Sequence, residues 1–205
     1  MKLHWSPRSP FVRKVMVCAY ETGVADRFEC VRTPVAMDTP NLSLLRDNPL
    51  SKLPTLVLDD GSALFDSSVI CEYLDTLHGG APLFPVNGAE RFRALQQQAF
   101  ADGLLDIYLL WRQERNKPPA QQRAQWLAAF RVKSDASLDA FETLSPSLRL
   151  DAIQIGDIAI ACMLAWLDFR LPDLEWRANR PRLAAWHARF AERDSMRRTE
   201  PADAE

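Results

Sequence analysis

The sequence lacks the features that would assign it to a membrane, an export pathway or a nucleic acid. No apolar run approaches the ~18 residues needed to cross a bilayer. Residues Met1–Trp5 do not begin the long apolar core of a secretory signal peptide. The formal net charge of −2 at pH 7 leaves no basic surplus of the kind that nucleic-acid binders carry. We therefore expect a cytoplasmic protein with no membrane or nucleic-acid partner.

Cysteine and histidine are scarce, and their spacing suits neither disulfides nor a metal. The four cysteines show no Cys-x-x-Cys spacing and each lies in an apolar stretch, so we expect buried free thiols. They are Cys18, Cys30, Cys71 and Cys162. The three histidines, which are His4, His78 and His187, show no metal-ligand spacing. We expect no metal cofactor.

The first part of the chain alternates strand and helix patterns. Hydrophobic residues make up 47% and charged residues 25% of the 205 residues, which is typical of a soluble globular protein. The order βαβ and then ββα predicts one small α/β domain over residues 1–80. The expected strands are 2–5, 27–32 and a hairpin after residue 54, and the expected helices are 11–22, 42–46 and 67–77.

The second part of the chain has a different pattern. A linker rich in Pro and Gly covers residues 81–88. Beyond it strand patterns end, and Leu, Ala, Phe and Trp recur at helical intervals, which predicts an all-helical domain over residues 89–205. The predicted helices are 89–113, 120–144, 155–169 and 180–193. Residues after Arg198 are expected to fray.

The hairpin and its flanks indicate a ligand site. An Asp-Gly turn between two short apolar runs predicts the hairpin itself. Pro54 stands at the start of its first strand, where a cis peptide bond is common, and such a turn leaves the backbone of Leu53 free to pair with a ligand. Asp66 and Ser67 open the next helix and offer N–H groups, a hydroxyl and a carboxylate in a small volume. This combination suits a ligand that carries both a carboxylate and an ammonium group.

Ser9 and Pro10 open the first predicted helix as an N-cap and a first helical residue, and this capping role alone accounts for the pair. The alternative is functional, because Ser9 Oγ at the positive end of a helix can donate a hydrogen bond to an anion. If the anion is a thiolate, lowering its pKa by two units from about 8.5 needs about 2.7 kcal/mol. A hydrogen bond to a charged group supplies about 1.5–3 kcal/mol, and a helix N-terminus about 0.3–1 kcal/mol more.

Segments in both halves of the chain, in the same order, resemble the cytosolic glutathione S-transferase family. They are Ser-Pro-Arg-Ser-Pro-Phe-Val-Arg-Lys at 6–14, the Asn-Pro…Lys-Leu-Pro-Thr-Leu run at 48–56, Asp-Ser at 66–67, Ala-Asp-Gly-Leu-Leu-Asp at 101–106, Ile-Gly-Asp-Ile-Ala at 155–159 and Leu-Asp-Phe-Arg at 167–170. The resemblance covers nearly the whole chain and has a bacterial character. It implies a thioredoxin-like domain followed by a helical bundle, a homodimer, and glutathione as co-substrate.

The resemblance assigns glutathione, γ-Glu-Cys-Gly, to the site at the hairpin. Asp66 would accept a hydrogen bond from the γ-glutamyl ammonium, and Ser67 would hold the α-carboxylate. Leu53, before a cis Pro54, would pair through its backbone with the cysteinyl residue. Lys52 would neutralise the glycyl carboxylate. The alternatives are an ordinary helix cap for Asp66 and Ser67, and a solvated loop charge for Lys52.

Further residues complete the site that the resemblance implies. Val35 lies in the loop expected to border the glycyl end of glutathione. Asp102 matches an acidic residue that in several classes reaches across the dimer to the γ-glutamyl group, and the alternative is an exposed helical aspartate. Ser9 would donate to the thiolate, with Ser6 as a rival hydroxyl near the position where other classes place a catalytic tyrosine.

The resemblance places an acceptor-substrate pocket between the first helix and the long helices of the second domain. Phe11, Tyr108 and Trp111 are the candidate lining residues, although an aromatic stripe at helical spacing is more often core. Arg8 and Arg112 would bias such a pocket toward anionic substrates.

Three positions depart from the family's pattern. Ser9 stands where thiol-handling members carry cysteine, which argues against covalent chemistry by a cysteine of the enzyme. Ser51 stands where glycine is frequent. Gln154 stands three residues before Asp157, where the family has Ser or Thr, so we expect a weakened capping box at that helix.

The function that the sequence predicts is that of a glutathione transferase, which stabilises the glutathione thiolate through Ser9 and conjugates it to a small electrophile. One alternative is a non-catalytic protein of the same fold that binds or regulates other proteins, because fold alone does not fix activity. Another is a glutathione-dependent isomerase, peroxidase or dehalogenase, which shares the glutathione site and differs in the second substrate.

Overall fold

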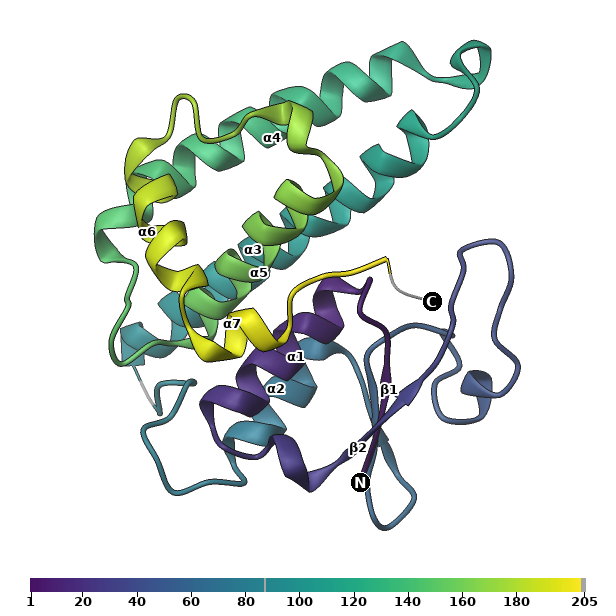
Figure 1. Cartoon of the computed structure of the whole chain (residues 1–205), viewed down its shortest axis with the longest axis vertical. Helices are drawn as coiled ribbons and strands as arrows, with labels where there is room; N and C mark the ends of the chain where they lie inside the picture. Colours follow the sequence, from purple (N-terminus) through teal and green to yellow (C-terminus); the bar gives the residue numbers. More distant parts are fainter. Residues whose placement is uncertain (87, 204–205) are drawn as a thin grey trace. The chain divides into compact units, whose positions relative to one another are not determined.

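The computed structural model describes residues 1–86 and 88–203, which form two compact units. Unit 1 comprises Met1–Arg91 together with Asp194–Glu205, and unit 2 comprises Phe92–Arg193. Unit 1 carries the sheet and unit 2 is helical (Figure 1). The predicted fold class, a thioredoxin-like α/β domain followed by a helical domain, is therefore confirmed. Asn87, in the predicted linker, lies outside the described residues.

A four-stranded sheet forms the centre of unit 1, with the strand order β2-β1-β3-β4. The strands are β1 (Lys2–Trp5), β2 (Glu29–Arg32), β3 (Thr55–Val57) and β4 (Ala63–Leu64). β1 and β2 are parallel, and the other two pairs are antiparallel. The parallel pair requires a helical crossover, and the last pair is the hairpin expected from the Asp-Gly turn, with Gly61 at a φ of 84°.

Two helices cover the sheet and supply the core of unit 1. They are α1 (Pro10–Glu21) and α2 (Ser67–Asp75), which lie side by side in Figure 1. Fully buried apolar residues from both helices and from the central strands form the core, namely Leu3, Val15, Leu56, Ile70 and Leu74. The short helix expected over 42–46 is a single 3-10 turn at Leu44–Arg46. Packing of this core fixes the starts of α1 and α2 relative to the ends of the strands.

The remaining elements are helical. The long helices are α3 (Gly88–Arg115), α4 (Ala124–Leu144), α5 (Ile155–Arg170) and α6 (Pro181–Ala191), and the last is α7 (Asp194–Arg198). Further 3-10 turns occur at Ala25–Arg27, Pro119–Gln121, Ser145–Ser147 and Pro172–Leu174. α5 is buried over most of its length, because its sequence is apolar on every face. It forms the core of unit 2.

The close approach of α5 to α3 leaves no room for a side chain at Gly156. A Cβ there would lie 2.6 Å from Cβ and Oε1 of Gln97 and 3.1 Å from the carbonyl oxygen of Ala94. Gln97 is itself buried, so it has little space to move away. We expect Gly156→Ala to lower the free energy of unfolding by about 1–3 kcal/mol, as overpacking does, in a urea titration.

Gly103 is the matched control for that substitution, because it is also helical but has open space where a Cβ would lie. Gly103→Ala should be neutral or should raise the free energy of unfolding by up to about 1 kcal/mol, since alanine is the better helix former. Equal losses at the two glycines would contradict the close approach of the two helices.

A reciprocal capping box opens α5, contrary to the weakened box expected from Gln154. Asp157 Oδ2 accepts the N–H of Gln154 at 2.8 Å, and its Oδ1 accepts the N–H of Arg149 at 3.0 Å. Asp157 is only 2% exposed, and burial raises the pKa of its carboxyl group against the opposing effect of these two bonds. Asp157 therefore connects the start of α5 to the loop before it. The spacing of Gln154 and Asp157 alone does not reveal the bond to Arg149.

The C-terminal segment lies along α1, whereas the sequence predicted fraying after Arg198 and placed this segment in the helical domain. α7 contacts α1 (Figure 1). The Arg13 guanidinium donates to the carbonyl oxygen of Met196 at 3.1 Å. Farther along, the N–H of Ala202 donates to the carbonyl oxygen of Pro7 at 3.4 Å. These contacts explain why the segment groups with unit 1.

The cysteines follow the expectation from composition with one exception. All four are free, and three of them, Cys18, Cys71 and Cys162, are buried. Cys30 is exposed, because β2 is an edge strand with solvent on one side. Within the described ranges, no helix is both long enough and apolar enough to span a membrane.

Candidate functional site

The register of the sheet brings the predicted site residues at positions 9, 53, 54, 66 and 67 to one edge of unit 1, which is the edge formed by the ends of the strands. β3 runs antiparallel to β1 with Thr55 opposite His4, so the start of β3 lies beside the end of β1. β4 is antiparallel to β3 with Leu64 opposite Leu56, so β4 ends at the same edge. The segments 6–9, 53–54 and 65–67, which follow or precede these strand ends, therefore meet at this edge.

Ser9 is the N-cap of α1, as predicted. Its backbone is extended, with φ −85° and ψ 118°, and its Oγ accepts the N–H of Val12 at 3.2 Å. Because the Oγ is the acceptor in this bond, its own proton remains available to donate. The hydroxyl is thus oriented by the helix that it caps and can donate to an anion at the positive end of that helix.

Ser6 lies in the same turn with a different environment. It is 9% exposed, and its Oγ accepts the N–H of Arg8 at 3.4 Å, a long contact. The backbone N–H of Ser9 donates to the Ser6 carbonyl oxygen at 3.2 Å, which holds the turn closed. Ser6 caps no helix, so only Ser9 has its hydroxyl in the field of α1.

The Leu53-Pro54 peptide bond is cis, which confirms the prediction from the proline position. β3 begins only at Thr55, so the backbone of Leu53 lies outside the sheet pairing. The side chain of Leu53 is buried, which stabilises the turn. A ligand with a peptide backbone can therefore pair with Leu53 in the manner of an additional strand.

Asn48 holds this turn in place and is a residue to which sequence reasoning assigned no role. It is 1% exposed, and its Nδ2 donates to the carbonyl oxygen of Lys52 at 3.2 Å and to Thr55 Oγ1 at 2.9 Å. Its Oδ1 accepts the N–H of Leu50 at 3.0 Å. The Asn-Pro pair at 48–49 is the sequence feature that could have indicated this role. Asn48 therefore acts as a positioning residue for the 50–54 turn.

Ser51 has a φ of 51°, in the left-handed region, which explains why glycine suits this position. Its hydroxyl offsets part of this strain by accepting the N–H of Asn41 at 2.9 Å.

We expect Ser51→Ala to lower the free energy of unfolding by about 1 kcal/mol, because it loses the bond and keeps the strain. Ser51→Gly should stay within about 0.5 kcal/mol of the wild type, because relief of strain offsets the lost bond. Urea titrations that rank glycine below alanine would refute this account.

Asp66 and Ser67 begin α2 at the same edge. Asp66 is the N-cap, and its Oδ1 accepts the N–H of Ser68 at 2.9 Å, while the residue as a whole is exposed. Ser67 is the first residue of the helix and is 2% exposed. A carboxylate accepts several hydrogen bonds, so Asp66 can cap the helix and still accept an ammonium group. The capping alternative and the ligand-binding prediction are therefore compatible.

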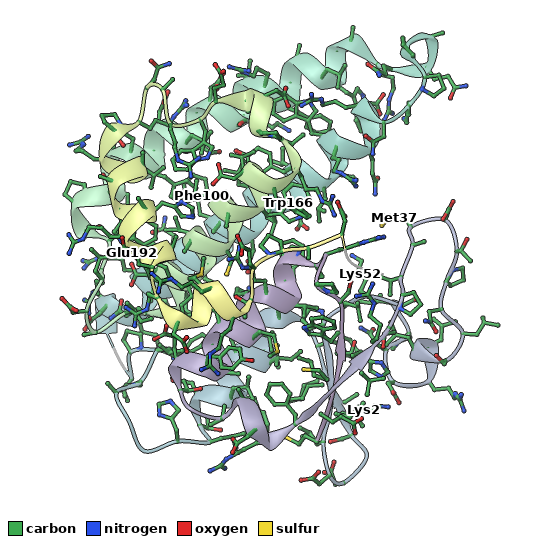
Figure 2. All side chains as sticks on the ribbon, in the orientation of Figure 1. Lys2, Met37, Lys52, Phe100, Trp166 and Glu192 are labelled. Atoms are coloured by element: carbon green, nitrogen blue, oxygen red, sulfur yellow. The ribbon has the colours of Figure 1, made fainter. Side chains whose placement is uncertain are left out.

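Lys52 and Val35 lie on exposed segments beside this edge. The Lys52 side chain is at the surface (Figure 2), while its carbonyl oxygen is held by Asn48 and by Thr55. Val35 is 41% exposed in the loop that follows β2. β2 is parallel to β1 with Arg32 opposite Trp5, so this loop leaves the sheet at the same edge.

His4 ties that loop to the sheet. Its Nδ1 lies 2.8 Å from Thr33 Oγ1 and its Nε2 lies 2.7 Å from Asp47 Oδ2. The hydrogen bond from His4 holds the pKa of the Asp47 carboxyl group below its usual range, with a smaller contribution from Lys2. His4 thus fixes both ends of the 33–47 loop that carries Val35, a role that the histidine spacing did not indicate.

Two family models match the chain. The model described as glutathione S-transferase, N-terminal domain, matches residues 8–77, and the model described as glutathione S-transferase, C-terminal domain, matches residues 124–189. A GST-like protein of Escherichia coli K12, named YibF and described as uncharacterized, is 35% identical over the full length of both chains. The chain belongs to the glutathione S-transferase family.

One solved structure agrees with this glutathione S-transferase assignment, and a further relative carries a different name. A glutathione transferase family member from Pseudomonas fluorescens Pf-5, solved with bound glutathione, is 41% identical and has a TM-score of 0.92, with 98% of both chains covered. A stringent starvation protein A homolog from Coxiella burnetii is 29% identical over 182 residues, which are 85% of this chain and 77% of the relative.

In this glutathione S-transferase, the acidic and aromatic candidate residues of unit 2 all lie on α3. Asp102 is partly exposed. Tyr108 is fully buried, and its hydroxyl lies 3.0 Å from Ser134 Oγ. Trp111 is 5% exposed and lies with its ring 6.4 Å from that of Tyr108 and 6.3 Å from that of Phe130. This placement favours the core alternative for both aromatic residues, and burial also raises the pKa of the Tyr108 hydroxyl.

The candidates Phe11 and Arg8 lie near the start of α1. Phe11 is partly exposed, with Lys14 Nζ 5.9 Å from its ring centre. Arg8 is exposed and donates through Nη2 to the carbonyl oxygen of Asp203 at 3.0 Å. Arg112, on α3, is partly exposed. Across the described part of the glutathione S-transferase chain, no three His, Cys, Asp or Glu side chains are grouped as a metal site would need.

Proposed function

We propose that this protein is a glutathione transferase that binds glutathione at the edge of unit 1 and conjugates it to a small electrophile. The observation that supports this most directly is the convergence of three features at that edge. They are the Ser9 cap of α1, the cis Leu53-Pro54 turn and the Asp66-Ser67 start of α2. Glutathione bound to the Pseudomonas fluorescens relative, which is 41% identical, supports the same ligand here.

In this proposal the peptide part of glutathione is held by the turn and by α2. The Leu53 backbone pairs with the cysteinyl residue, Asp66 accepts from the γ-glutamyl ammonium, and Ser67 with the N-terminal amides of α2 binds the α-carboxylate. Lys52 neutralises the glycyl carboxylate, and Val35 borders it. In a homodimer, Asp102 of the partner chain completes the γ-glutamyl contacts.

The sulfur is held by Ser9 at the start of α1. A hydrogen bond from Ser9 Oγ to the thiolate contributes about 1.5–3 kcal/mol, and the helix N-terminus adds about 0.3–1 kcal/mol. Together these terms match the roughly 2.7 kcal/mol that lowers a thiol pKa by two units. The thiolate then attacks a nearby electrophilic carbon and forms a C–S bond, while the displaced electron pair leaves with a halide or moves to the oxygen of an opened epoxide or of an enone. Proximity supplies much of the rate acceleration. Ser9 itself forms no covalent intermediate.

Retention on immobilised glutathione, with elution by free glutathione, tests the binding half of the proposal. We expect the wild-type protein to be retained, and we expect Asp66→Asn to raise the Kd for glutathione about tenfold or more, because a charged acceptor is lost. Asparagine is also a good N-cap, so the start of α2 should survive. Asp151→Asn, at an exposed position of unit 2, is the matched control and should bind normally. Absence of retention of the wild-type protein would overturn the proposal.

A second candidate function is regulation of another protein without catalysis, because fold alone does not fix activity and one relative, the stringent starvation protein A homolog, does not carry the name of a transferase. The two candidates differ in turnover. A protein that is retained on glutathione but transfers no glutathione to any electrophile in a panel of aryl halides, epoxides and enones would support the regulatory function. The same panel, extended to peroxides and to isomerisable ketones, separates a transferase from the specialised glutathione-dependent enzymes.

A further inference from the structure

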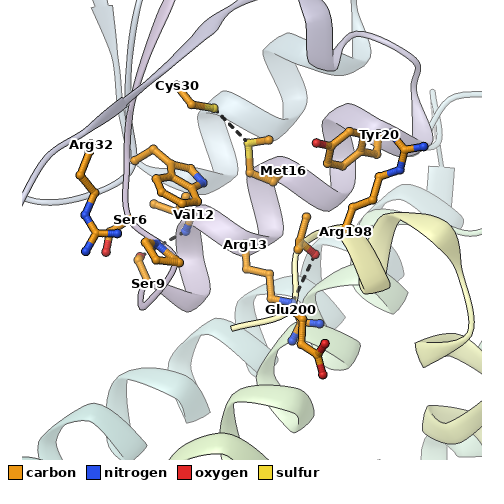
Figure 3. A pocket seen from close by; sticks show the side chains of 13 residues that line it. Ser6, Ser9, Val12, Arg13, Met16, Tyr20, Cys30, Arg32, Arg198 and Glu200 are labelled. Atoms are coloured by element: carbon orange, nitrogen blue, oxygen red, sulfur yellow. Dashed lines mark hydrogen bonds between the residues drawn. The ribbon is translucent and has the colours of Figure 1, made fainter. Parts of the chain in front are cut away.

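Unit 1 has a hollow on each face of its sheet. The hollow on the α1 side is lined by residues that include Ser9, Val12 and Met16 (Figure 3). The other hollow lies between the opposite face of the sheet and the loop at residues 33–47, and we call it the outer-face pocket. Its lining residues come from β1, from the end of β2 and from that loop, so unit 1 alone forms it. Its volume is about 470 Å³, which is within the range for small-molecule sites.

The alternation of side chains along the strands places polar groups in the outer-face pocket. Leu3 is fully buried in the core beneath α1 and α2, so its neighbours Lys2 and His4 point to the opposite face. Val31 lies opposite His4 in the parallel strand and shares that face. The bonds from His4 to Thr33 and Asp47 hold both ends of the 33–47 loop over this face. The pocket therefore has two fixed walls, one of strand residues and one of loop residues.

Three cationic side chains line this space, namely Lys2 on β1, Arg32 at the end of β2 and Arg46 on the Leu44–Arg46 turn. Lys2 Nζ donates to Asp47 Oδ2 at 3.1 Å, which uses one of the three N–H donors of an ammonium group. Arg46 is exposed, and its side chain forms no hydrogen bond or ion pair with any residue that the structure describes. Lys2 and Arg46 can therefore both donate to a ligand.

The net charge of the outer-face pocket is positive. Asp47 is the one carboxylate among the lining residues in the described ranges, and it already accepts bonds from His4 and Lys2. With His4 neutral, three cations and one carboxylate leave a formal charge of +2. A phosphate monoester carries a charge of about −1.5 to −2 at pH 7. It matches the charge of the pocket, whereas a single carboxylate would compensate only half of it.

The neutral lining groups are suited to a ligand with hydroxyl groups. They include the side chains of Thr33, Asn41 and Ser43. The Ser43 hydroxyl donates to Asn41 Oδ1 at 2.7 Å, so its remaining lone pairs can accept from a ligand hydroxyl. Apart from the imidazole of His4, no aromatic ring belongs to the lining residues in the described part of the chain. Hydroxyl groups therefore suit the remainder of the ligand better than a flat ring does.

We propose that the outer-face pocket binds the phosphate monoester of a small polyhydroxy molecule, as in a sugar phosphate. The guanidinium groups of Arg32 and Arg46 pair with the phosphate oxygens, and Lys2 adds a third charged contact. Ligand hydroxyl groups donate to Ser43. The proposal goes beyond the transferase function, because the residues proposed above to bind glutathione are not among the lining residues in the described ranges.

Isothermal titration with ribose 5-phosphate tests the proposal, in a phosphate-free buffer at about pH 7.5, where the ester is almost fully dianionic. Glutathione is left out of the titration. Ribose tests the need for the anion, and inorganic phosphate tests the need for the sugar. We expect ribose 5-phosphate to bind, inorganic phosphate to bind about fivefold more weakly or worse, and ribose to give no measurable heat.

Substitutions at Arg46 test the contact with the phosphate. Arg46→Gln should weaken binding of ribose 5-phosphate about five- to tenfold, which is the loss of one charge-assisted contact. Arg46→Lys keeps the charge but loses the planar fork, so it should weaken binding only about two- to threefold. Arg27→Gln is the matched control, because Arg27 is an exposed arginine of unit 1 that does not line the pocket. It should change the Kd less than about twofold.

Acetylation of Lys2 reports where the ligand binds. Saturating ribose 5-phosphate should slow acetylation of Lys2 by N-hydroxysuccinimidyl acetate about threefold or more, as measured by peptide mass spectrometry, because a bound phosphate engages the ammonium group. Lys133, an exposed residue of unit 2, is the internal reference and should react at an unchanged rate.

Four results would each overturn the proposal. They are the absence of ribose 5-phosphate binding, equal affinity for inorganic phosphate, equal effects of Arg46→Gln and Arg27→Gln, and an unprotected Lys2. Failure of the protein to bind immobilised glutathione would leave all of these readouts unchanged, so the proposed transferase function and this site fail independently.

Discussion

Ser9→Ala is expected to lower kcat/KM for conjugation about 100-fold near pH 5.5, with little change in the affinity for glutathione. The reason is that the substitution removes the donor to the thiolate but none of the groups that hold the peptide. A thiol pKa that returns by two units to about 8.5 leaves about one hundredth of the thiolate at a pH below both values. The loss therefore resides in the fraction of reactive thiolate and not in binding.

The pH dependence separates this role from a structural one. As the pH rises above about 8.5, the thiol ionises without help from Ser9, so the rates of Ser9→Ala and of the wild type should converge. The ultraviolet absorbance of the bound thiolate should show the same shift of the apparent pKa in a direct titration. A rate defect of constant size across the pH range would refute thiolate stabilisation by Ser9.

Two control variants assign the effect to the correct hydroxyl. Ser9→Thr keeps both the hydroxyl and the N-cap, and it should retain most of the activity. Ser6→Ala should leave the pH profile unchanged, because Ser6 Oγ lies outside the field of α1; a shifted profile would reassign the role to Ser6. The lost cap in Ser9→Ala costs about 0.5–2 kcal/mol of stability, which a urea titration measures separately from turnover.

Much of the proposed glutathione site could be predicted from the sequence because its signals are local. Ser9-Pro10 is a helix start in any context, and the Asp-Gly turn fixes the hairpin register that brings residues 54 and 66 to one edge. The cis bond before Pro54 follows from a proline at the start of a strand in the interior of the sheet. Short-range rules were sufficient for these features because the ligand site is built from strand ends and helix starts.

The residues that support the site could not be predicted, because their contacts are distant in sequence. His4 bonds to side chains 29 and 43 residues away, and no spacing rule covers such pairs. The C-terminal segment was expected to fray for the same reason, since Arg13 lies 183 residues from the Met196 carbonyl that it binds. For Tyr108 and Trp111 the helical spacing was correct, but spacing alone does not tell a core aromatic from a pocket aromatic, and only burial does.

Asp157→Ala is expected to lower the free energy of unfolding by about 2–5 kcal/mol, which is the largest stability effect that we predict. Its carboxylate accepts the backbone N–H groups of Gln154 and Arg149 at 2.8 and 3.0 Å. Alanine leaves both donors without this acceptor at a position that is 2% exposed. Each buried donor that loses its partner costs about 1–3 kcal/mol. Urea unfolding measures the change, and a loss below about 1 kcal/mol would contradict the role of Asp157 in joining α5 to the preceding loop.

Asp157→Asn separates the hydrogen bonds from the charge. Burial raises the pKa of Asp157 in the folded protein above its ordinary value of 3.8, so the folded state releases this proton less readily than the unfolded chain. The unfolded chain ionises first as the pH rises, so the stabilisation from Asp157 is full below about pH 3.8 and declines until the pH passes the folded pKa. Asparagine does not titrate and lacks this decline. The stability advantage of the wild type over Asp157→Asn should therefore be greatest at acid pH and smaller at pH 7, and an advantage that grows with pH would show that the carboxylate is stabilised in its ionised form.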